Sequence, residues 1–454
     1  MSVEHALHRL QSGTYTEQLE AVEVLILAPE PRLLGAVTRV LERCTDARLM
    51  TRLCMLLGAF QDPRAIGPLL RASLSQEAEV ESAAFSAILV IGAARAAGLP
   101  ALEVALAADP QAHETRFDWQ LDTEAIRQLD RALQSDDPRL RVAALYGQAA
   151  LTYRGGLRAI SERLYHDPDW SVRGAAAYAL GELTLEHEYA SLGEALIWSW
   201  WASEEALSRV DEAEALSALS DARLAILKGL AECLLEAATP VFEAGLSAAE
   251  ARLRQMAILG LGRLGAASSD SSPFAHALST VLGDREVSVR RSAAEAIGRL
   301  GERGVTAVLP ALITALTGAD PELRAAILSA AQQAPREVEV FVTERFSFAI
   351  EEEQVALCAL AGSLRLQGLI EAAISSASPL LRKTGYLAIS RGELTEWSGY
   401  LEQGLKDQDW RARIAAAEGL RRLGVGVEAL RRAQKKEKHP NVRTAIERIL
   451  QALS

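Results

Sequence analysis

The chain has few of the residues that mark disulfide-rich, metal-binding or β-rich proteins. Among its 454 residues only four are cysteine and seven histidine, and aromatic side chains make up 5%. The cysteines are scattered and form no C-x-x-C pair, so we expect neither a disulfide framework nor a structural zinc site. Alanine and leucine dominate a hydrophobic fraction of 49%. This composition favours close-packed helices over sheets.

Long apolar runs and a basic charge balance are also missing. The first twenty residues, MSVEHALHRLQSGTYTEQLE, contain no apolar core of the kind a secretory signal needs. No stretch of about 18 uncharged apolar residues occurs, so we expect no membrane span and a cytoplasmic protein. The net charge of −12 argues against nucleic acid as a partner, because non-specific binding of that kind needs many Lys and Arg side chains on phosphates.

Known catalytic motifs are absent from the sequence. There is no G-x-x-x-x-G-K-[ST] phosphate loop, no H-E-x-x-H zinc motif and no G-x-S-x-G nucleophile elbow. The histidines are dispersed, and His5 with His8 at the terminus make a poor metal site. We therefore expect a non-enzymatic protein with no metal and no cofactor.

Internal repeats are the main positive feature. DPDWSVRGAAAYALGEL from Asp167, DREVSVRRSAAEAIGRL from Asp284 and DQDWRARIAAAEGLRRL from Asp407 align without gaps. After each aligned arginine, apolar or small residues recur on one helical face, and a second amphipathic segment lies between successive copies. Each unit is thus predicted to be a helix pair. The aligned arginines are Arg141, Arg173, Arg223, Arg254, Arg290, Arg324, Arg382, Arg413 and Arg443, with Gln354 filling the slot between Arg324 and Arg382.

This pattern resembles the HEAT-like repeats named after phycobilisome lyases, with their signature of Asp, a Pro or turn, Val-Arg, paired Ala and Leu-Gly. The resemblance covers most of residues 46–454 and implies an all-α, right-handed α-solenoid of about 12 to 14 helix pairs. It also implies that an Asp in the turn of each repeat bonds the Arg of the following helix. The expected structural ladder is Asp167 with Arg173, Asp284 with Arg290, and Asp407 with Arg413.

The repeat register predicts five segments. They are an N-terminal helical cap (1–45), N-terminal HEAT-like repeats (46–183, degenerate around 109–130, including Trp119), an acidic Trp-rich insertion or long helix pair (184–222), C-terminal HEAT-like repeats (223–424) and a basic C-terminal cap repeat (425–454). For the last segment, a solubilising end and a surface for an acidic partner both explain the basic charge.

The insertion holds three of the seven tryptophans, in the stretch ALIWSWWASEE. On a helical wheel Trp200 lies on the apolar face and Trp201 at its margin, so a core-filling role is expected for Trp200 and, with it, Trp201. Trp198 points instead toward Glu194 and Glu205. An exposed Trp beside carboxylates is typical of an interface anchor, and the sequence leaves open whether the cluster is core or interface.

The polar face of the arginine helices is expected to line the concave side of the array and to bind a partner. Nine positions after the aligned arginine, the series changes from acidic to basic along the chain, and two tyrosines occupy the fifth position in its acidic part. The candidate partner-binding residues are Trp198, Trp201, Tyr146, Tyr178, Glu182, Glu232, Arg263, Arg299, Arg391 and Arg422.

The resemblance narrows the function only in part, because fold does not imply activity. The chain looks like bacterial HEAT-repeat proteins of unknown function, some encoded beside type VI secretion genes, which implies a scaffold that binds another protein, such as an adaptor or chaperone for an effector or spike component. The alternative is a bilin lyase or isomerase, or another small-molecule binder, with Arg263, Arg299 and Tyr178 around a tetrapyrrole. A di-iron deoxyhypusine hydroxylase is rejected, because only two His-Glu dipeptides occur.

Overall fold

The structure is a computed structural model, and it describes residues 2–97, 123–151, 153–183 and 189–453. These ranges contain 27 α-helices joined by turns and short 3-10 helices, and no β-strand. The predicted all-α solenoid is confirmed. Much of the degenerate segment expected around 109–130, with Trp119, lies outside the described residues, as does the start of the expected insertion at 184–188.

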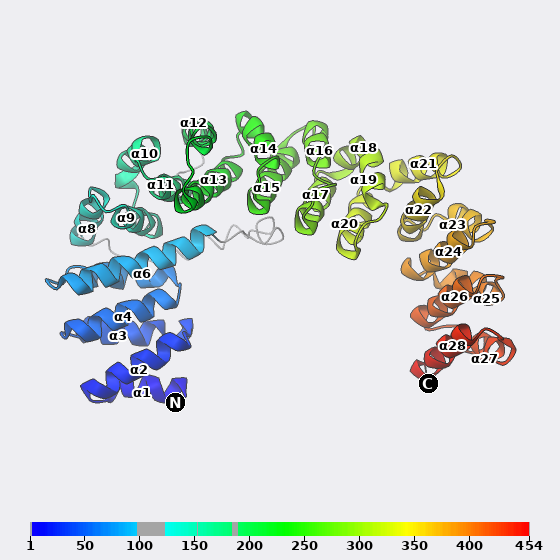
Figure 1. Cartoon of the computed structure of the whole chain (residues 1–454), viewed down its shortest axis with the longest axis horizontal. Helices are drawn as coiled ribbons and strands as arrows, with labels where there is room; N and C mark the ends of the chain where they lie inside the picture. Colours follow the sequence, from blue (N-terminus) through cyan, green and yellow to red (C-terminus); the bar gives the residue numbers. More distant parts are fainter. Residues whose placement is uncertain (1, 98–122, 152, 184–188, 454) are drawn as a thin grey trace. The chain divides into compact units, whose positions relative to one another are not determined.

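The helices form two compact units, residues 1–260 and 261–454. In the first unit, first and second helices of successive pairs make two layers, with α8, α10, α12 and α14 in one and α9, α11 and α13 in the other (Figure 1). The helices of this unit are α1 (Val3–Ser12), α2 (Tyr15–Leu27), α3 (Leu34–Arg43), α4 (Ala47–Ala59), α5 (Ile66–Ala72), α6 (Ala78–Ala97), α8 (Thr123–Leu133), α9 (Pro138–Ala150), α10 (Leu157–His166), α11 (Trp170–Leu183), α12 (Tyr189–Leu207), α13 (Ala213–Cys233) and α14 (Thr239–Leu246).

The second unit continues the paired arrangement, and the boundary between the units falls within α15 (Ala251–Ala267). The helices of this unit are α16 (Ser272–Ser279), α17 (Val287–Arg299), α18 (Gly301–Ala307), α19 (Leu309–Leu316), α20 (Pro321–Ala331), α21 (Pro335–Phe346), α22 (Glu351–Ser363), α23 (Gln367–Ile374), α24 (Pro379–Arg391), α25 (Ser398–Gly404), α26 (Trp410–Leu423), α27 (Val427–Lys436) and α28 (Pro440–Ala452).

Small residues let the second helices approach one another closely. Every residue of α9 from Arg141 to Ala149 is buried, so this helix is covered on all sides by its neighbours. In α11, a Cβ added to Gly174 would lie 2.8 Å from the Cα of Ala222 in α13. The Ala-rich and Gly-rich composition of these helices is therefore the condition for stacking repeats on each other.

Most of the second helices begin at the same place in the repeat. They start three residues before the aligned arginine, as α11 does before Arg173 and α26 before Arg413. Side chains in the preceding turn cap several of them: the carboxylates of Asp137, Asp320 and Asp409 accept backbone N–H bonds of α9, α20 and α26. The exception is α13, which begins ten residues before Arg223.

Candidate interaction surfaces

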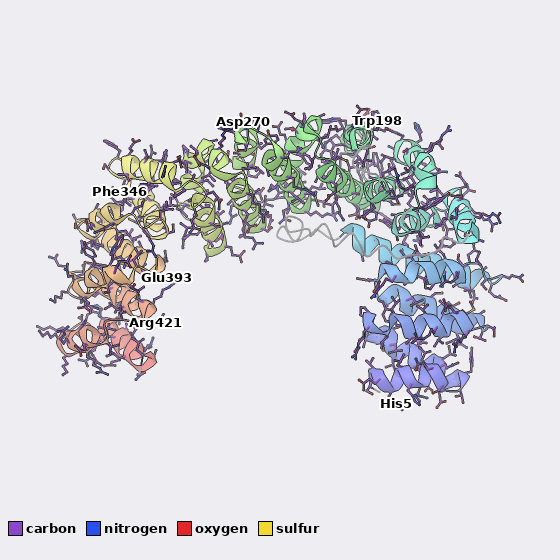
Figure 2. All side chains as sticks on the ribbon, turned by 180° about the vertical axis from the view of Figure 1, so that it is seen from behind. His5, Trp198, Asp270, Phe346, Glu393 and Arg421 are labelled. Carbon is purple, nitrogen blue, oxygen red and sulfur yellow. The ribbon has the colours of Figure 1, made fainter. Side chains whose placement is uncertain are left out.

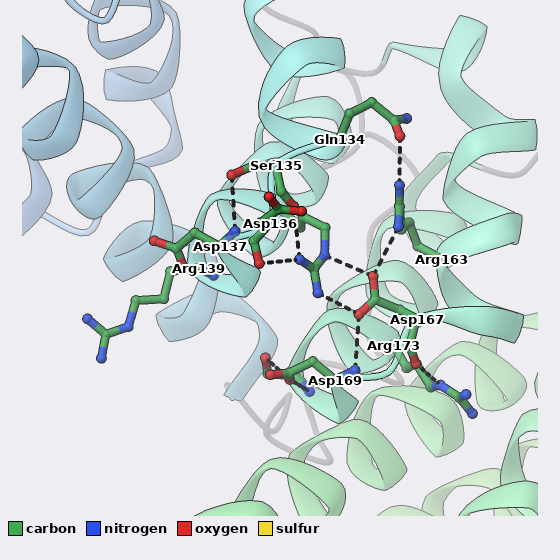
Figure 3. A network of polar contacts seen from close by, with 11 residues as sticks. Gln134, Ser135, Asp136, Asp137, Arg139, Arg163, Asp167, Asp169 and Arg173 are labelled. Carbon is green, nitrogen blue, oxygen red and sulfur yellow. Dashed lines mark hydrogen bonds and ion pairs between the residues drawn. The ribbon is translucent and has the colours of Figure 1, made fainter.

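Several of the aligned arginines, Arg141, Arg290, Arg382 and Arg413, link neighbouring repeats. Arg141 donates from Nη1 to the backbone carbonyls of Ser135 and Asp136, at 2.9 and 3.0 Å, in the turn before its own helix. Its Nε and Nη2 donate to the carboxylate of Asp167 in the next repeat, at 2.9 and 2.8 Å (Figure 3). A bidentate pair of this kind fixes distance and orientation together. Arg141 therefore connects the turn before α9 to the turn before α11.

Asp167 is the buried acceptor of this network. Its side chain is 0% exposed and that of Arg141 is 8% exposed. The carboxylate also accepts from Arg163 and from the backbone N–H of Asp169. Arg173, the partner expected from the sequence, donates instead to the backbone carbonyl of Asp167, at 2.6 Å. The expected pairing within one repeat is thus corrected: the carboxylate bonds the arginine of the preceding repeat.

The second unit follows the same rule. Arg290 donates to the carbonyl of Asp284 at 2.7 Å and to the carboxylate of Asp320 at 2.9 Å. Arg413 donates to the carbonyl of Asp407 at 2.8 Å. The expected pairs of Asp284 with Arg290 and Asp407 with Arg413 are therefore bonds to backbone carbonyls. They remain structural contacts, but the ionic link runs between repeats.

Two carboxylates show the electrostatic effect of this link. Asp407 accepts both Nε and Nη2 of Arg382, at 2.8 and 2.9 Å, and Glu437 accepts two bonds from Arg413. Burial raises the pKa of each carboxyl, but hydrogen bonds from the arginine and from backbone N–H groups outweigh burial, so both pKa values lie below the ordinary range. Both groups are therefore held in the charged form.

The insertion changes the role of one arginine. Because α13 is extended at its start, Arg223 lies well inside the helix rather than next to a turn. It bonds the carboxylate of Glu204 on α12, and its guanidinium carbon lies 4.2 Å from the centre of the Trp200 ring. Burial lowers the pKa of Arg223, and the nearby acids Glu204 and Glu250 oppose this shift. Arg223 thus joins the two helices of the long pair.

The three tryptophans of α12 have different environments. Trp200 is fully buried beneath Arg223, as expected for a core residue. Trp201 is 47% exposed, so the expectation that it fills the core with Trp200 is wrong. Trp198 is 48% exposed, and its ring packs edge-on against Tyr165 of α10 with centroids 5.1 Å apart. We call Trp198, Trp201 and Tyr165 the aromatic ridge.

The aromatic ridge lies on the first-helix layer of its unit, where Trp198 is seen at the outer edge (Figure 2). Burial raises the pKa of Tyr165, and the charge of Glu194 raises it further, which places that carboxylate beside the ring. Residues 186–214 carry eight acids and one arginine. The ridge therefore presents two half-exposed indoles, with Tyr165 packed against one of them, in an acidic stretch of the chain.

The two tyrosines expected on the concave face are not accessible. Tyr146 and Tyr178 are 9% and 7% exposed, and their rings meet edge-to-face with centroids 5.6 Å apart. Burial raises the pKa of Tyr146 to about 12. They pack between neighbouring second helices, because the fifth position after the arginine faces the next repeat rather than solvent. Their proposed role in binding is corrected to a packing role.

The charged residues that lie nine positions after the aligned arginines are at the surface. Glu182 and Glu232, in the first unit, are exposed, and so are Arg391 and Arg422 in the second. Arg263 and Arg299, also in the second unit, are partly exposed. The acidic and basic parts of the series thus belong to different units.

Arginines gather in the second unit. Partial desolvation lowers the pKa of Arg391, and the charges of Arg324 and Arg422 lower it further, so Arg391 lies near both of these cations. No ion pair joins any of them to a carboxylate in the part of the chain that the structure describes. A buried Nη1 of Arg299 also has no hydrogen-bond partner there. This surface favours anionic groups of a partner.

The described ranges hold neither a metal-ligand cluster nor a membrane-spanning helix. No group of three or more His, Cys, Asp or Glu side chains within them could hold a metal ion. None of the helices in these ranges is both long and apolar enough to cross a membrane. Burial raises the pKa of the Cys54, Cys233 and Cys358 thiols to about 12. Those three thiols are therefore unreactive packing groups.

A family model for the HEAT repeat matches residues 157–187, which include α10 and α11. The chain contains HEAT-like repeats. A bilin biosynthesis protein, PecE of a Nostoc species, is 29% identical over 157 residues, or 34% of this chain. The matched region spans 62% of that relative's length.

Solved structures give more distant similarities. A crystal structure of an engineered protein covers 86% of this chain at 15% identity, with 98% of its own length aligned and a TM-score of 0.38. The karyopherin Kap121p bound to RanGTP covers 98% at 14% identity, with 48% of its own length aligned and a TM-score of 0.46. Kap121p bound to the extreme C-terminus of Cdc14p covers 98% at 12% identity, with 56% aligned and a TM-score of 0.39.

Proposed function

We propose that the chain is a protein-interaction scaffold and that the aromatic ridge is its main binding surface. The observation that carries this proposal is the half exposure of Trp198 and Trp201 on a helix held in place by the fully buried Trp200. Trp is enriched among the residues that dominate binding energy, and a rigid support lowers the entropic cost of ordering it.

The chemistry of the ridge defines the complementary partner. Two indoles offer apolar area, and the surrounding acids, Glu194 among them, favour positive charge on the other side. A partner surface with an apolar pocket rimmed by Lys or Arg fits both features.

Affinity capture with matched variants tests the proposal. Trp198→Ala should weaken binding of a captured and then purified partner by at least about 2 kcal/mol, roughly 30-fold, in isothermal titration. Met55→Ala is the control, because Met55 on α4 is 47% exposed and lies outside the ridge. Equal affinity of the Trp198 variant and the wild type would overturn the assignment.

The narrower role, an adaptor or chaperone for a secretion effector or spike component, rests on the family resemblance of the sequence. It predicts that the chain co-purifies with one such component in a stoichiometric complex and that Trp198→Ala abolishes that complex. Co-purification with unrelated proteins only would remove this role and leave the scaffold.

A second candidate is favoured by the similarity to a bilin biosynthesis protein. The bilin site expected from the sequence needs modification, because Tyr178 is buried against Tyr146. Arg263 and Arg299 remain as partly exposed cations for the propionates. Addition of an open-chain tetrapyrrole to the purified protein tests this candidate: a shifted absorption band that is lost in Arg299→Met would support it over the scaffold, and an unchanged spectrum would remove it.

A further inference from the structure

The repeat formed by α21 and α22 lacks the residues of the arginine ladder. Gln354 stands where the aligned arginine is expected, and Phe348 stands six residues before it, the position held by Asp167, Asp284 and Asp407 in other repeats. Gln354 reaches only a backbone carbonyl, that of Phe346, at 2.9 Å. The turn between α21 and α22 therefore presents an apolar ring at the position where the turns at Asp167, Asp284 and Asp407 present a carboxylate.

Large apolar side chains are exposed at this turn. Phe348 is 90% and Ile350 is 69% exposed. In the next repeat, Leu380 near the start of α24 is 45% exposed. The two turns are in contact, because the hydroxyl of Ser378 bonds the carboxylate of Glu351. We call Phe348, Ile350 and Leu380 the apolar turn patch.

Several observations distinguish this patch from scattered surface residues. Ile350 directly precedes Glu351, and Leu380 lies two residues after Ser378, so both flank the bond that joins the turns. Ile350 and Ser378 also occupy the same place, as the residues preceding the first turns of α22 and α24. The patch thus lies on the same edge of two neighbouring repeats, and large apolar side chains exposed together on one edge are typical of a contact surface.

The segment that contains the turn between α21 and α22 is acidic. Residues 337–353 contain six glutamates and a single arginine, Arg345. Arg345 is paired with Glu353 at 2.7 Å. Glu344 and Glu352 are exposed. The one arginine of this segment is therefore already paired, and the exposed carboxylates of Glu344 and Glu352 are left for a partner.

We propose that the apolar turn patch docks a basic amphipathic segment of a partner protein. A helix or extended peptide with large apolar side chains on one face covers Phe348, Ile350 and Leu380, and Lys or Arg beside that face pair with Glu344 and Glu352. Helix-in-groove and edge recognition use this combination of apolar anchors and flanking charge. The glutamates disfavour an anionic lipid surface, because such surfaces attract basic segments and repel acidic ones.

This docking surface lies in the unit formed by residues 261–454, and the aromatic ridge lies in the other unit. The proposal is independent of the ridge, although it adds a second contact to the scaffold function. A negative result in the test of the patch would leave the proposal for the aromatic ridge standing. A negative result for the ridge would likewise leave the proposal for the patch standing.

Fluorescence anisotropy with a defined probe tests the proposal. The probe is a labelled peptide of about 18 residues, five helical turns, built from Leu and Lys with an apolar face. Titration uses the full chain at about 0.15 M salt, where weak surface attraction is screened. The wild type should bind this probe, and a Phe348→Ala/Ile350→Ala variant should bind it at least ten-fold more weakly. Both side chains are exposed, and circular dichroism should show the fold of the variant unchanged.

Matched variants separate this site from general attraction to an acidic protein. Leu27→Ala is the control, since Leu27 is 87% exposed at the end of α2, and it should bind the probe as the wild type does. Glu344→Gln/Glu352→Gln should lower the affinity and its salt dependence. Equal binding by the Phe348→Ala/Ile350→Ala variant, or a loss caused instead by Trp198→Ala, would overturn the proposal.

Two further probes distinguish the class of partner. A peptide of Leu and Glu with the same apolar face should not bind. Vesicles of phosphatidylcholine and phosphatidylglycerol should not bind either. If either probe binds the wild type and this binding is lost in the Phe348→Ala/Ile350→Ala variant, the occupant of the patch is not a basic protein segment.

Discussion

Removal of the Asp167 carboxylate should open its repeat locally. In an Asp167→Ala variant, Arg141 keeps its two carbonyl acceptors but loses both bonds of the bidentate pair, with a side chain only 8% exposed. Breaking a buried ion pair from one side costs about 3 to 5 kcal/mol, because the remaining charge stays desolvated. We expect the free energy of opening of α9 and α11 to fall by about 3 kcal/mol.

A double-mutant cycle identifies the partner of that carboxylate. Asp167→Ala combined with Arg141→Met should show a coupling energy of about 1 to 3 kcal/mol. The cycle with Arg173→Met should show about 0.5 kcal/mol or less, because Arg173 bonds the backbone carbonyl of Asp167. The sequence favours pairing of Asp167 with Arg173, whereas the structure pairs Asp167 with Arg141. The two coupling energies therefore distinguish these two pairings.

Native-state hydrogen exchange followed by mass spectrometry is the suitable assay. Repeat arrays of this length do not unfold in one step, so the opening of individual helices is better defined than a single melting temperature. The exposed pair Arg158 with Glu162, whose side chains are 94% and 64% exposed, provides the control and should contribute less than about 0.5 kcal/mol. Coupling to Arg173 equal to or larger than coupling to Arg141 would refute the inter-repeat ladder.

Three more perturbations should have defined effects. Trp200→Ala should lower the opening free energy of α12 and α13 by about 3 to 5 kcal/mol in hydrogen exchange, since Trp200 is fully buried; an effect below 1 kcal/mol would contradict its core role. The lowered pKa of Asp407 means that its stabilisation is present above the unfolded pKa of about 4 and is lost as pH falls through the folded value. The opening free energy of α24 and α26, obtained from exchange rates corrected for the intrinsic pH dependence of amide exchange, should fall on acidification, and Asp407→Asn should weaken that dependence; an opening free energy that does not change with pH would refute this link. Gly260→Ala should destabilise α14 and α15 by about 2 kcal/mol in exchange experiments, because its Cβ would lie 2.2 Å from the Phe242 ring; wild-type exchange would contradict that close approach.

The repeat pattern predicted the helices and the position of each arginine, because the spacing of apolar and small residues determines which face of a helix is buried. It did not give the partner of the arginine. Asp167 lies six residues before Arg173 and 26 after Arg141, and only the stacking of repeats decides between them. An acid 24 to 30 residues after Arg141, Arg290, Arg382 and Arg413 was the sequence signal that could have revealed the link.

The surfaces were predictable to different degrees. A helical wheel placed Trp198 on the polar side correctly, because its environment depends mainly on its own helix. It failed for Tyr146 and Tyr178, because their burial depends on the offset between adjacent helices. The sequence pattern did not predict the apolar turn patch, since Gln354 fills the arginine slot and the repeat register continues through it. Phe348 in place of an Asp was the signal that could have drawn attention to it.

Site-specific photocrosslinking in cells that produce the protein shows directly whether the aromatic ridge binds another protein. A photoreactive phenylalanine analogue replaces Trp198 in one variant and Met55, of similar exposure, in another. The scaffold account predicts a discrete protein adduct from position 198 that is absent from position 55. No adduct at position 198, or the same adducts from both positions, would contradict it.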